Sequence, residues 1–243
     1  MNPPPLPSKQ TKLFGNNFVF ESMPDPGNPI GLLENLLKFP GRVVHELHQT
    51  RSAILAMWLL IFGIVGVAIY GIVVGAQSGG AQLWIAPAKL GLGTLLSVLI
   101  CLPSLYIFLC LSGIDAQLRN VCGALFAAVC LTSILLIGFA PVAWIFSQST
   151  DSIVFMGTLH LFFWVVGIRF GLRLIDATRR FLGATSRGHL RIWSVIFILV
   201  CLQMTTTLRP IIAASKRFLP TEKKFFLTNW FETINGSNTV QKK

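Results

Sequence analysis

Four charged residues follow one another along one face of an apolar segment, and they are the side chains best placed to do chemistry. They follow the uncharged run 153–166 at steps of four, three and four residues, and comprise Arg169, Arg173, Asp176 and Arg180. In an α-helix this spacing puts all of them on one face. Asp176 lies one turn from Arg173 and from Arg180, so it can pair with either. The segment predicts a helix that presents a charged stripe to protein, water or lipid head groups.

Basic side chains at the ends of the apolar runs are candidate contacts for anionic lipid or another anion, because membrane phosphates attract them. The candidates are Arg119, Arg169, Arg173, Arg179, Arg180, Arg187 and Arg209. The alternative is that long arginine side chains near a helix end reach the head groups and only fix the depth of the helix. Arg169 lies deeper, between Gly167 and Gly171, where a neighbouring helix could approach closely and supply carbonyl or hydroxyl partners.

A second polar group lies in the last apolar run, and it consists of Gln203, Thr205, Thr206, Thr207, Arg209 and Pro210. Pro210 frees a backbone carbonyl one turn earlier, and threonine hydroxyls can satisfy such groups. The group is either a site for an anion or a lipid head group, or a helix end anchored by an arginine. We expect it on the opposite side of the membrane from the Arg169 stripe, so the two do not form one site.

The remaining candidates for chemistry are histidines. His160 stands alone in an apolar run, where it predicts one interhelical hydrogen bond, with a proton relay as the alternative. His45 and His48 lack the HExxH spacing that stacks two histidines on one helix face, so no metal site is predicted. Enzyme motifs are missing as well. The sequence predicts no catalytic residue, no metal and no cofactor.

The composition excludes a soluble domain. Apolar residues make up 53% of the 243 residues and charged residues only 12%, against roughly 25% charged residues in soluble domains. The formal charge of +11 comes mainly from basic residues at the ends of apolar runs, so it indicates membrane lipids as partners rather than nucleic acid. The five cysteines all fall inside apolar runs, where buried thiols behave as small apolar side chains.

The apolar runs predict an all-α, polytopic membrane protein with a bundle of five transmembrane helices, since each run can cross a core of about 30 Å. The expected spans are about 53–76, 89–113, 121–146, 153–176 and 192–213, within a transmembrane domain of 53–213. Residues 1–28 are expected to be a disordered cytoplasmic tail, and residues 214–243 a basic aromatic tail. Residues 29–52 predict an amphipathic helix, kinked at Pro40, that lies in the membrane interface.

Glycine pairs four residues apart predict faces for close helix packing, and these are Gly71 with Gly75 and Gly167 with Gly171. The distribution of lysine and arginine places the N-terminus in the cytoplasm. Five spans then put the basic C-terminal tail outside. The alternative is that the region 203–209 marks a re-entrant break, which would return the tail to the cytoplasm.

Four runs, YGIVVGAQSGGAQLW, CLPSLYIFLCLSG, GFAPVAWIFSQST and LQMTTTLRPI, resemble a group of uncharacterised multi-pass inner-membrane proteins in bacteria. This resemblance implies the inner (cytoplasmic) membrane as the location. The plan of a cytoplasmic N-terminal segment followed by five closely spaced helices over 53–213 is also similar in topology to the Yip1-type family. That likeness implies a non-enzymatic role in membrane organisation or trafficking.

These observations predict a non-catalytic membrane protein that scaffolds or organises membrane components and contacts anionic lipid. Its partners would be lipids, further copies of the chain or other membrane proteins. The alternative is a small transporter or channel subunit that works as an oligomer, with a pathway lined by Gln203, the threonines, His160 and Arg169.

Overall fold

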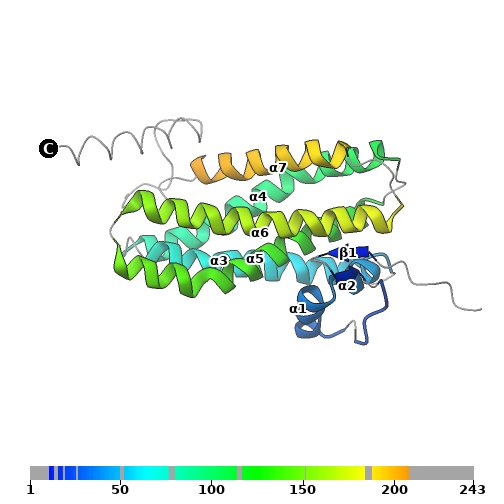
Figure 1. Ribbon diagram of the computed structural model, residues 1–243, viewed down its shortest axis with the longest axis horizontal. Coiled ribbons are helices and arrows are strands. Elements are labelled where there is room, and N and C mark those ends of the chain that lie inside the picture. Colours follow the sequence, from blue (N-terminus) through cyan, green and yellow to red (C-terminus); the bar gives the residue numbers. More distant parts are fainter. Residues whose placement is uncertain are drawn as a thin grey trace, which may run out of the picture.

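The computed structural model describes residues 11–13, 16–18, 20–25, 27–49, 52–76, 80–113, 117–150, 152–183 and 188–207. These residues form seven α-helices and one short hairpin (Figure 1). Four helices are long and apolar enough to cross a membrane, and they are α3 (Ser52–Ala76), α4 (Gln82–Leu111), α5 (Leu118–Ser149) and α6 (Ile153–Phe181). The last described helix, α7 (Gly188–Thr207), is apolar over the shorter stretch Gly188–Gln203. Residues 208–213 of the predicted fifth span lie outside the described residues.

Local signals in the sequence set several helix ends. The side chain of Ser152 accepts a hydrogen bond from the Phe155 amide and caps the start of α6. Gly113 and Gly183 follow the ends of α4 and α6 with φ angles of 81° and 82°, a conformation that glycine adopts without steric cost. In an apolar environment every backbone N–H and C=O group needs a hydrogen bond within the protein. An α-helix supplies these bonds itself, which is why the long apolar runs are helical.

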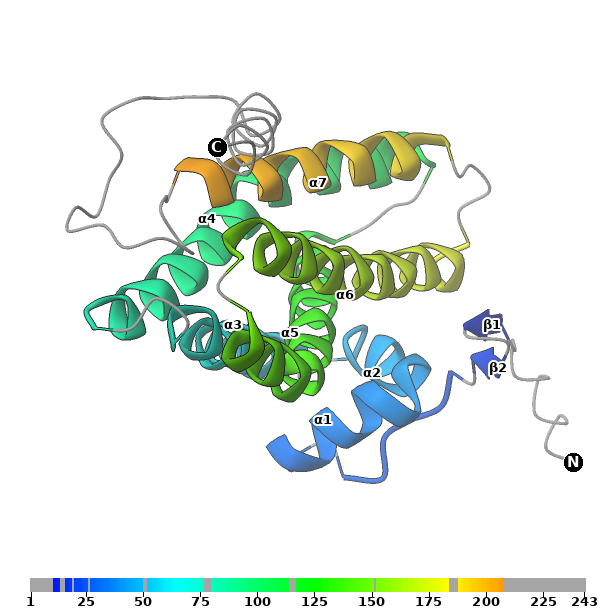
Figure 2. The ribbon, with the colours of Figure 1, turned by 60° about the vertical axis from the view of Figure 1, so that its left-hand side comes forward.

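α5 is the central helix of the bundle. It packs against α3 on one side and α6 on the other, and 67% of its most apolar stretch is buried, more than in any other of the four long helices. α4 packs against α3, and α7 packs mainly against α4 rather than α6 (Figures 1 and 2). This order leaves one side of α6 facing outward.

Glycines set the distance between α3 and α4. A Cβ atom at Gly71 would lie 2.6 Å from the Cα of Pro87, and one at Gly75 would overlap the carbonyl of Gln82. The backbones of the two helices are therefore in direct contact. α4 begins at Gln82, seven residues before the predicted start of the span at about residue 89, and the helix includes Pro87 at the close contact. Lys89 lies within the helix and is fully buried.

The N-terminal segment forms more structure than the predicted disordered tail. Two three-residue strands, β1 (Thr11–Leu13) and β2 (Asn16–Phe18), pair in antiparallel register, with Thr11 opposite Phe18. They lie near the end of α6. Met23 is buried in the adjoining core. Apolar contacts with the helix bundle thus order part of a segment whose composition alone favours disorder.

The amphipathic segment forms two helices, α1 (Pro29–Lys38) and α2 (Pro40–Glu46), separated at Phe39. Asn28 caps α1 by accepting from the amides of Ile30 and Gly31. The predicted apolar stripe faces protein: its buried members pack against α3, α5 and α6 at one end of the bundle, and are Leu32, Leu36, Val43, Val44 and Leu47. A second set of apolar side chains on these helices is exposed, and comprises Ile30, Leu37 and Phe39.

α7 is held on α4 by Trp193, which is fully buried. Its indole nitrogen donates to the Ser104 hydroxyl at 3.1 Å and lies 3.3 Å from the Cys101 carbonyl. The ring stacks on Phe197, with centroids 5.2 Å apart. This contact joins segments about ninety residues apart and makes α7 part of the bundle.

Candidate functional site

α6 has two faces of different character. On one, Gly167 and Gly171 are buried against α5, where a Cβ at Gly171 would lie 2.8 Å from the Ala128 carbonyl oxygen. The Thr132 hydroxyl lies 3.1 Å from the Gly167 carbonyl oxygen and 2.8 Å from the Ala128 carbonyl oxygen of its own helix, so its one proton is shared between the two acceptors. On the other face, Arg169 is exposed. Residues two apart on a helix point in roughly opposite directions, so the close approach expected at this glycine pair brings no partner from α5 to Arg169.

The surroundings of Arg169 on this outer face are apolar. Phe162 and Val165 lie on the same face and are 59% and 54% exposed. Arg173, one turn beyond Arg169, is also exposed, and its guanidinium lies 5.6 Å from the centre of the Phe170 ring. In the part of the chain that the structure describes, Arg169 has no hydrogen bond or ion pair. We call this strip, from Phe162 to Arg173, the outer α6 face.

Arg169 lies close to the middle of the bundle, measured along its axis. Its neighbours Gly167 and Gly171 pack on Thr132 and Ala128, so Arg169 is level with residue 130 of α5. Gly63, near the middle of α3, packs on Cys130 at the same level. From Arg169 to the end of α6 at Phe181 is about 18 Å at 1.5 Å per residue. An arginine side chain does not cover that distance.

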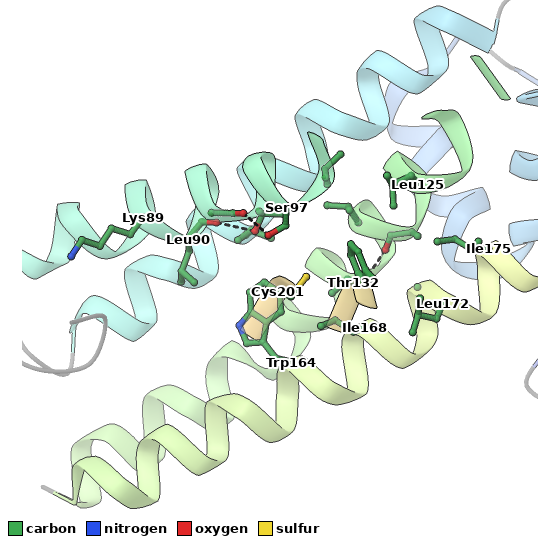
Figure 3. Close-up of a pocket in the computed structure, with 18 residues that line it drawn as sticks. Lys89, Leu90, Ser97, Leu125, Thr132, Trp164, Ile168, Leu172, Ile175 and Cys201 are labelled. Carbon is green, nitrogen blue, oxygen red and sulfur yellow. Dashed lines mark hydrogen bonds between the residues drawn. The ribbon is translucent and has the colours of Figure 1, made fainter. Parts of the chain in front are cut away.

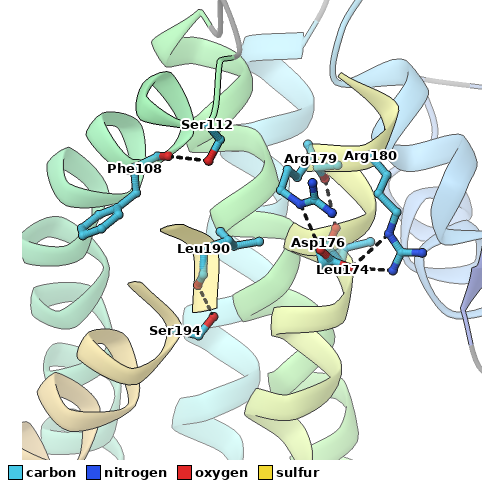
Figure 4. Close-up of polar contacts among 9 residues, drawn as sticks. Phe108, Ser112, Leu174, Asp176, Arg179, Arg180, Leu190 and Ser194 are labelled. Carbon is cyan, nitrogen blue, oxygen red and sulfur yellow. Dashed lines mark hydrogen bonds and ion pairs between the residues drawn. The ribbon is translucent and has the colours of Figure 1, made fainter. Parts of the chain in front are cut away.

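Asp176 joins two arginines at the end of α6 (Figure 4). Its carboxylate oxygens accept from the Nε atoms of Arg179 and Arg180, each at 3.0 Å. Arg180 is the partner that the spacing predicts, and Arg179 is a second one. Arg179 is only 1% exposed, so little of its side chain is open to lipid. A carboxylate one turn away lets the charge of Arg179 be buried.

Several predicted site residues lie outside the description. Arg187 and Arg209 are not among the described residues. Thr205, Thr206 and Thr207 complete α7, but their side chains are not described. Gln203 is partly buried and engaged within the chain.

A cavity of about 50 Å³ lies inside the bundle between α4, α5, α6 and α7 (Figure 3). Its walls are mostly apolar, and its polar side chains are Lys89, Thr94, Ser97 and Thr132. The three hydroxyls donate to backbone carbonyls of their own helices. Figure 3 shows the Lys89 amine at the far end, away from Ser97 and Thr132. The cavity thus has little free polarity with which to hold a ligand.

His160 makes the single interhelical hydrogen bond that its position predicts. Its Nδ1 lies 2.6 Å from the hydroxyl of Tyr70 on α3, and the two rings meet edge to face. Both side chains are buried, and Nε2 of His160 has no hydrogen-bond partner in the described part of the chain. Tyr70 was missed as the partner, because the sequence does not tell which helix faces His160. In a membrane such a bond contributes about 0.6 kcal/mol.

The described residues contain no group of three or more His, Cys, Asp or Glu side chains that could hold a metal ion. The chain matches no protein-family model, no curated protein and no solved structure. The resemblances drawn from the sequence therefore stay predictions.

An aromatic and histidine cluster joins the N-terminal segment to the end of α6. The ring of Phe181 lies 4.8 Å from that of Phe20, 5.0 Å from His48 and 6.1 Å from His45. His48 donates through Nδ1 to the Val44 carbonyl at 2.7 Å, which leaves Nε2 as a buried nitrogen without a partner among the described residues. Burial, with a smaller contribution from His45, lowers the pKa of His48 below its usual 6.5.

Acidification is expected to loosen this cluster. Between the lowered pKa of folded His48 and the usual value near 6.5, the unfolded segment binds more protons, so the stability contributed by His48 falls as the pH falls. Hydrogen exchange of the amides in 43–47 should speed up several-fold between pH 7.5 and 5 after correction for the intrinsic rate. In His48→Phe this extra pH dependence should disappear. An unchanged pH profile in the variant would contradict the assignment.

Proposed function

We propose that the protein is a non-catalytic integral membrane protein that organises other membrane components. It holds partner membrane proteins on the outer α6 face and anionic lipid at its basic end. The observation that carries the proposal is the exposure of Arg169 and Arg173 on an apolar outer surface. The hydroxyls and the histidine inside the bundle are engaged within the chain itself. A protein built in this way acts through its surface rather than through an internal pathway.

The proposal includes five spans, with α7 and the residues after it, up to about 213, as the fifth. α7 lies along α4, and its apolar stretch is Gly188–Gln203. The basic residues at the α1 and α2 end support a cytoplasmic N-terminus, in the inner membrane. The exposed side chains of Ile30, Leu37 and Phe39 suit the membrane interface, which leaves α1 and α2 between bundle and lipid.

The basic end supplies the lipid contacts. Arg119, Arg173 and Arg191 are exposed there, on α5, α6 and α7. Arg179 is buried, so we assign the lipid contacts to the exposed arginines. Each arginine near an anionic surface adds about 1 kcal/mol of attraction, so three on this part of the bundle form a rim that prefers anionic lipid.

Lipid selectivity tests this proposal. The protein is reconstituted in vesicles with spin-labelled phosphatidylglycerol or phosphatidylcholine, and the fraction of each lipid held at the protein surface is measured. The wild type should prefer phosphatidylglycerol, and the triple change of Arg119, Arg173 and Arg191 to Gln should abolish most of that preference. The matched variant with Lys at the three positions keeps the charge and should retain it. Equal selectivity in the Gln and Lys variants would contradict the lipid contacts.

The second candidate function is a transporter or channel subunit that works as an oligomer, and the cavity in the bundle is the observation in its favour. The cavity supports transport less well than the exposed surface supports scaffolding, because about 50 Å³ takes few water molecules and the walls are mostly apolar. The same vesicles decide between the two candidates. A flux of ions into the vesicles above that of protein-free vesicles would favour the transporter or channel subunit.

A further inference from the structure

We propose that Arg169 binds a carboxylate in the middle of a partner's transmembrane helix, which docks on the outer α6 face. This inference rests on the proposed function and names the chemistry of the partner. Its basis is the position of Arg169, exposed on the bundle surface about halfway along α3, α5 and α6.

The depth of Arg169 separates it from the other arginines of the chain. Arg173 lies one turn nearer the basic end, and Arg180 and Arg119 lie at that end. α6 has 29 residues and is about 43 Å long, about 13 Å longer than a hydrocarbon core of about 30 Å, so with the excess shared between its two ends Arg169 lies about 11 Å inside the core and Arg173 about 5 Å. Snorkelling along the helix surface therefore accounts for Arg173 but leaves Arg169 in the apolar layer.

A cation at that depth is costly and needs a counter-charge or a wet surround. The α5 side of the helix offers none, because Gly167, Gly171 and Thr132 close that contact. On the outer face the neighbours of Arg169 are the exposed, apolar Phe162 and Val165. A carboxylate brought by a second helix would neutralise Arg169, and the apolar side chains beside it would pack against that helix.

A second copy of the chain does not supply this carboxylate. In the five helices α3 to α7 the described sequence contains one acidic residue, Asp176. Asp176 lies about 10 Å along the helix from Arg169 and is engaged by Arg179 and Arg180. The partner is therefore a different membrane protein with Asp or Glu at mid-span.

Designed transmembrane peptides test the pairing. A leucine-rich helix with one central Glu, labelled with an acceptor dye, is compared with otherwise identical helices that carry Gln or Leu. Association with the donor-labelled full-length protein is measured by energy transfer in phosphatidylcholine vesicles. The Glu peptide should associate about five- to tenfold more tightly than the Gln peptide, in the range of polar contacts between membrane helices.

The variant Arg169→Leu should bind the Glu and Gln peptides equally, and Arg169→Lys should keep part of the preference for the Glu peptide. The matched control Lys38→Leu removes an exposed cation from the end of α1, outside both proposed surfaces, and should leave the preference unchanged. Since Arg169 contacts neither the glycine face nor the core, folding of the Leu variant is expected to be normal, and circular dichroism checks it.

The outcomes separate this inference from the proposed function. Equal binding of the Glu and Gln peptides would overturn the carboxylate pairing, while a helix-docking face would still stand. A Glu preference that survives in Arg169→Leu would also overturn it. If the preference vanishes when phosphatidylglycerol is added, Arg169 lies within reach of the lipid phosphates, which would overturn the mid-membrane pairing. Absence of any peptide association would overturn the pairing, and the lipid selectivity measurement would still test the basic rim.

Discussion

Replacing Gly71 with leucine is expected to destabilise the bundle by about 3 kcal/mol, at the upper end for overpacked cores. The Cβ atom alone would lie 2.6 Å from the Cα of Pro87 and 3.0 Å from its nitrogen. Both are backbone atoms of α4, so no side chain can rotate away, and the two helices must separate. Unfolding of the purified protein by SDS titration, followed by circular dichroism, measures the loss.

The same substitution at Gly138 is the matched control. Gly138 lies on the exposed side of α5, and a Cβ there would have no atom within 4 Å. Gly138→Leu should change stability by less than about 0.5 kcal/mol. Similar losses at Gly71 and Gly138 would show that leucine harms these helices for a reason other than the α3–α4 contact. Gly75→Leu should behave like Gly71→Leu, since a Cβ there meets the Gln82 carbonyl.

Asp176→Asn is expected to cost about 3 kcal/mol, the lower end for removing one member of a buried pair. The change keeps the size of the side chain but removes the negative charge that faces Arg179, which is 1% exposed. The lower end applies because the Asp176 side chain is itself 27% exposed and water compensates in part. The same SDS titration measures this effect.

Arg180→Gln tests whether burial is the cause. Arg180 has the same carboxylate as partner, but its side chain is 30% exposed, so its loss should cost less than about 1 kcal/mol. A double-mutant cycle with Asp176→Asn and Arg179→Gln should give a larger coupling energy than the cycle with Arg180→Gln. Equal coupling energies would mean that the buried position of Arg179 contributes nothing.

Sequence periodicity and composition determined the helical class and the location of the long helices. The fourth apolar run matches α6 closely at its start, because Ser152 caps the helix and the apolar pattern begins at once. The start of α4 was missed by seven residues. Pro87 and the polar Gln82 indicate a loop locally, whereas the contact of α3 with α4 at Gly71 and Gly75 carries the helix through them.

The candidate site shows the same division. A 3.6-residue period predicts that Arg169, Arg173, Asp176 and Arg180 share a side of α6, and that Asp176 reaches Arg180. It does not predict which side packs on α5. The packing side is set by Gly167 and Gly171 of α6, which let the helix backbone contact α5 at Ala128 and Thr132. This contact leaves Arg169 facing outward.

The sequence by itself determined that the chain is helical, apolar and basic at one end, because these properties depend on neighbours along the chain. The tertiary structure alone decided which polar side chains are buried or hydrogen-bonded inside the bundle. Arg179 is buried, His160 is hydrogen-bonded to Tyr70 ninety residues away, and Arg169 lies on the surface. Burial depends on how the helices are rotated about their axes, and close packing between distant segments sets that rotation.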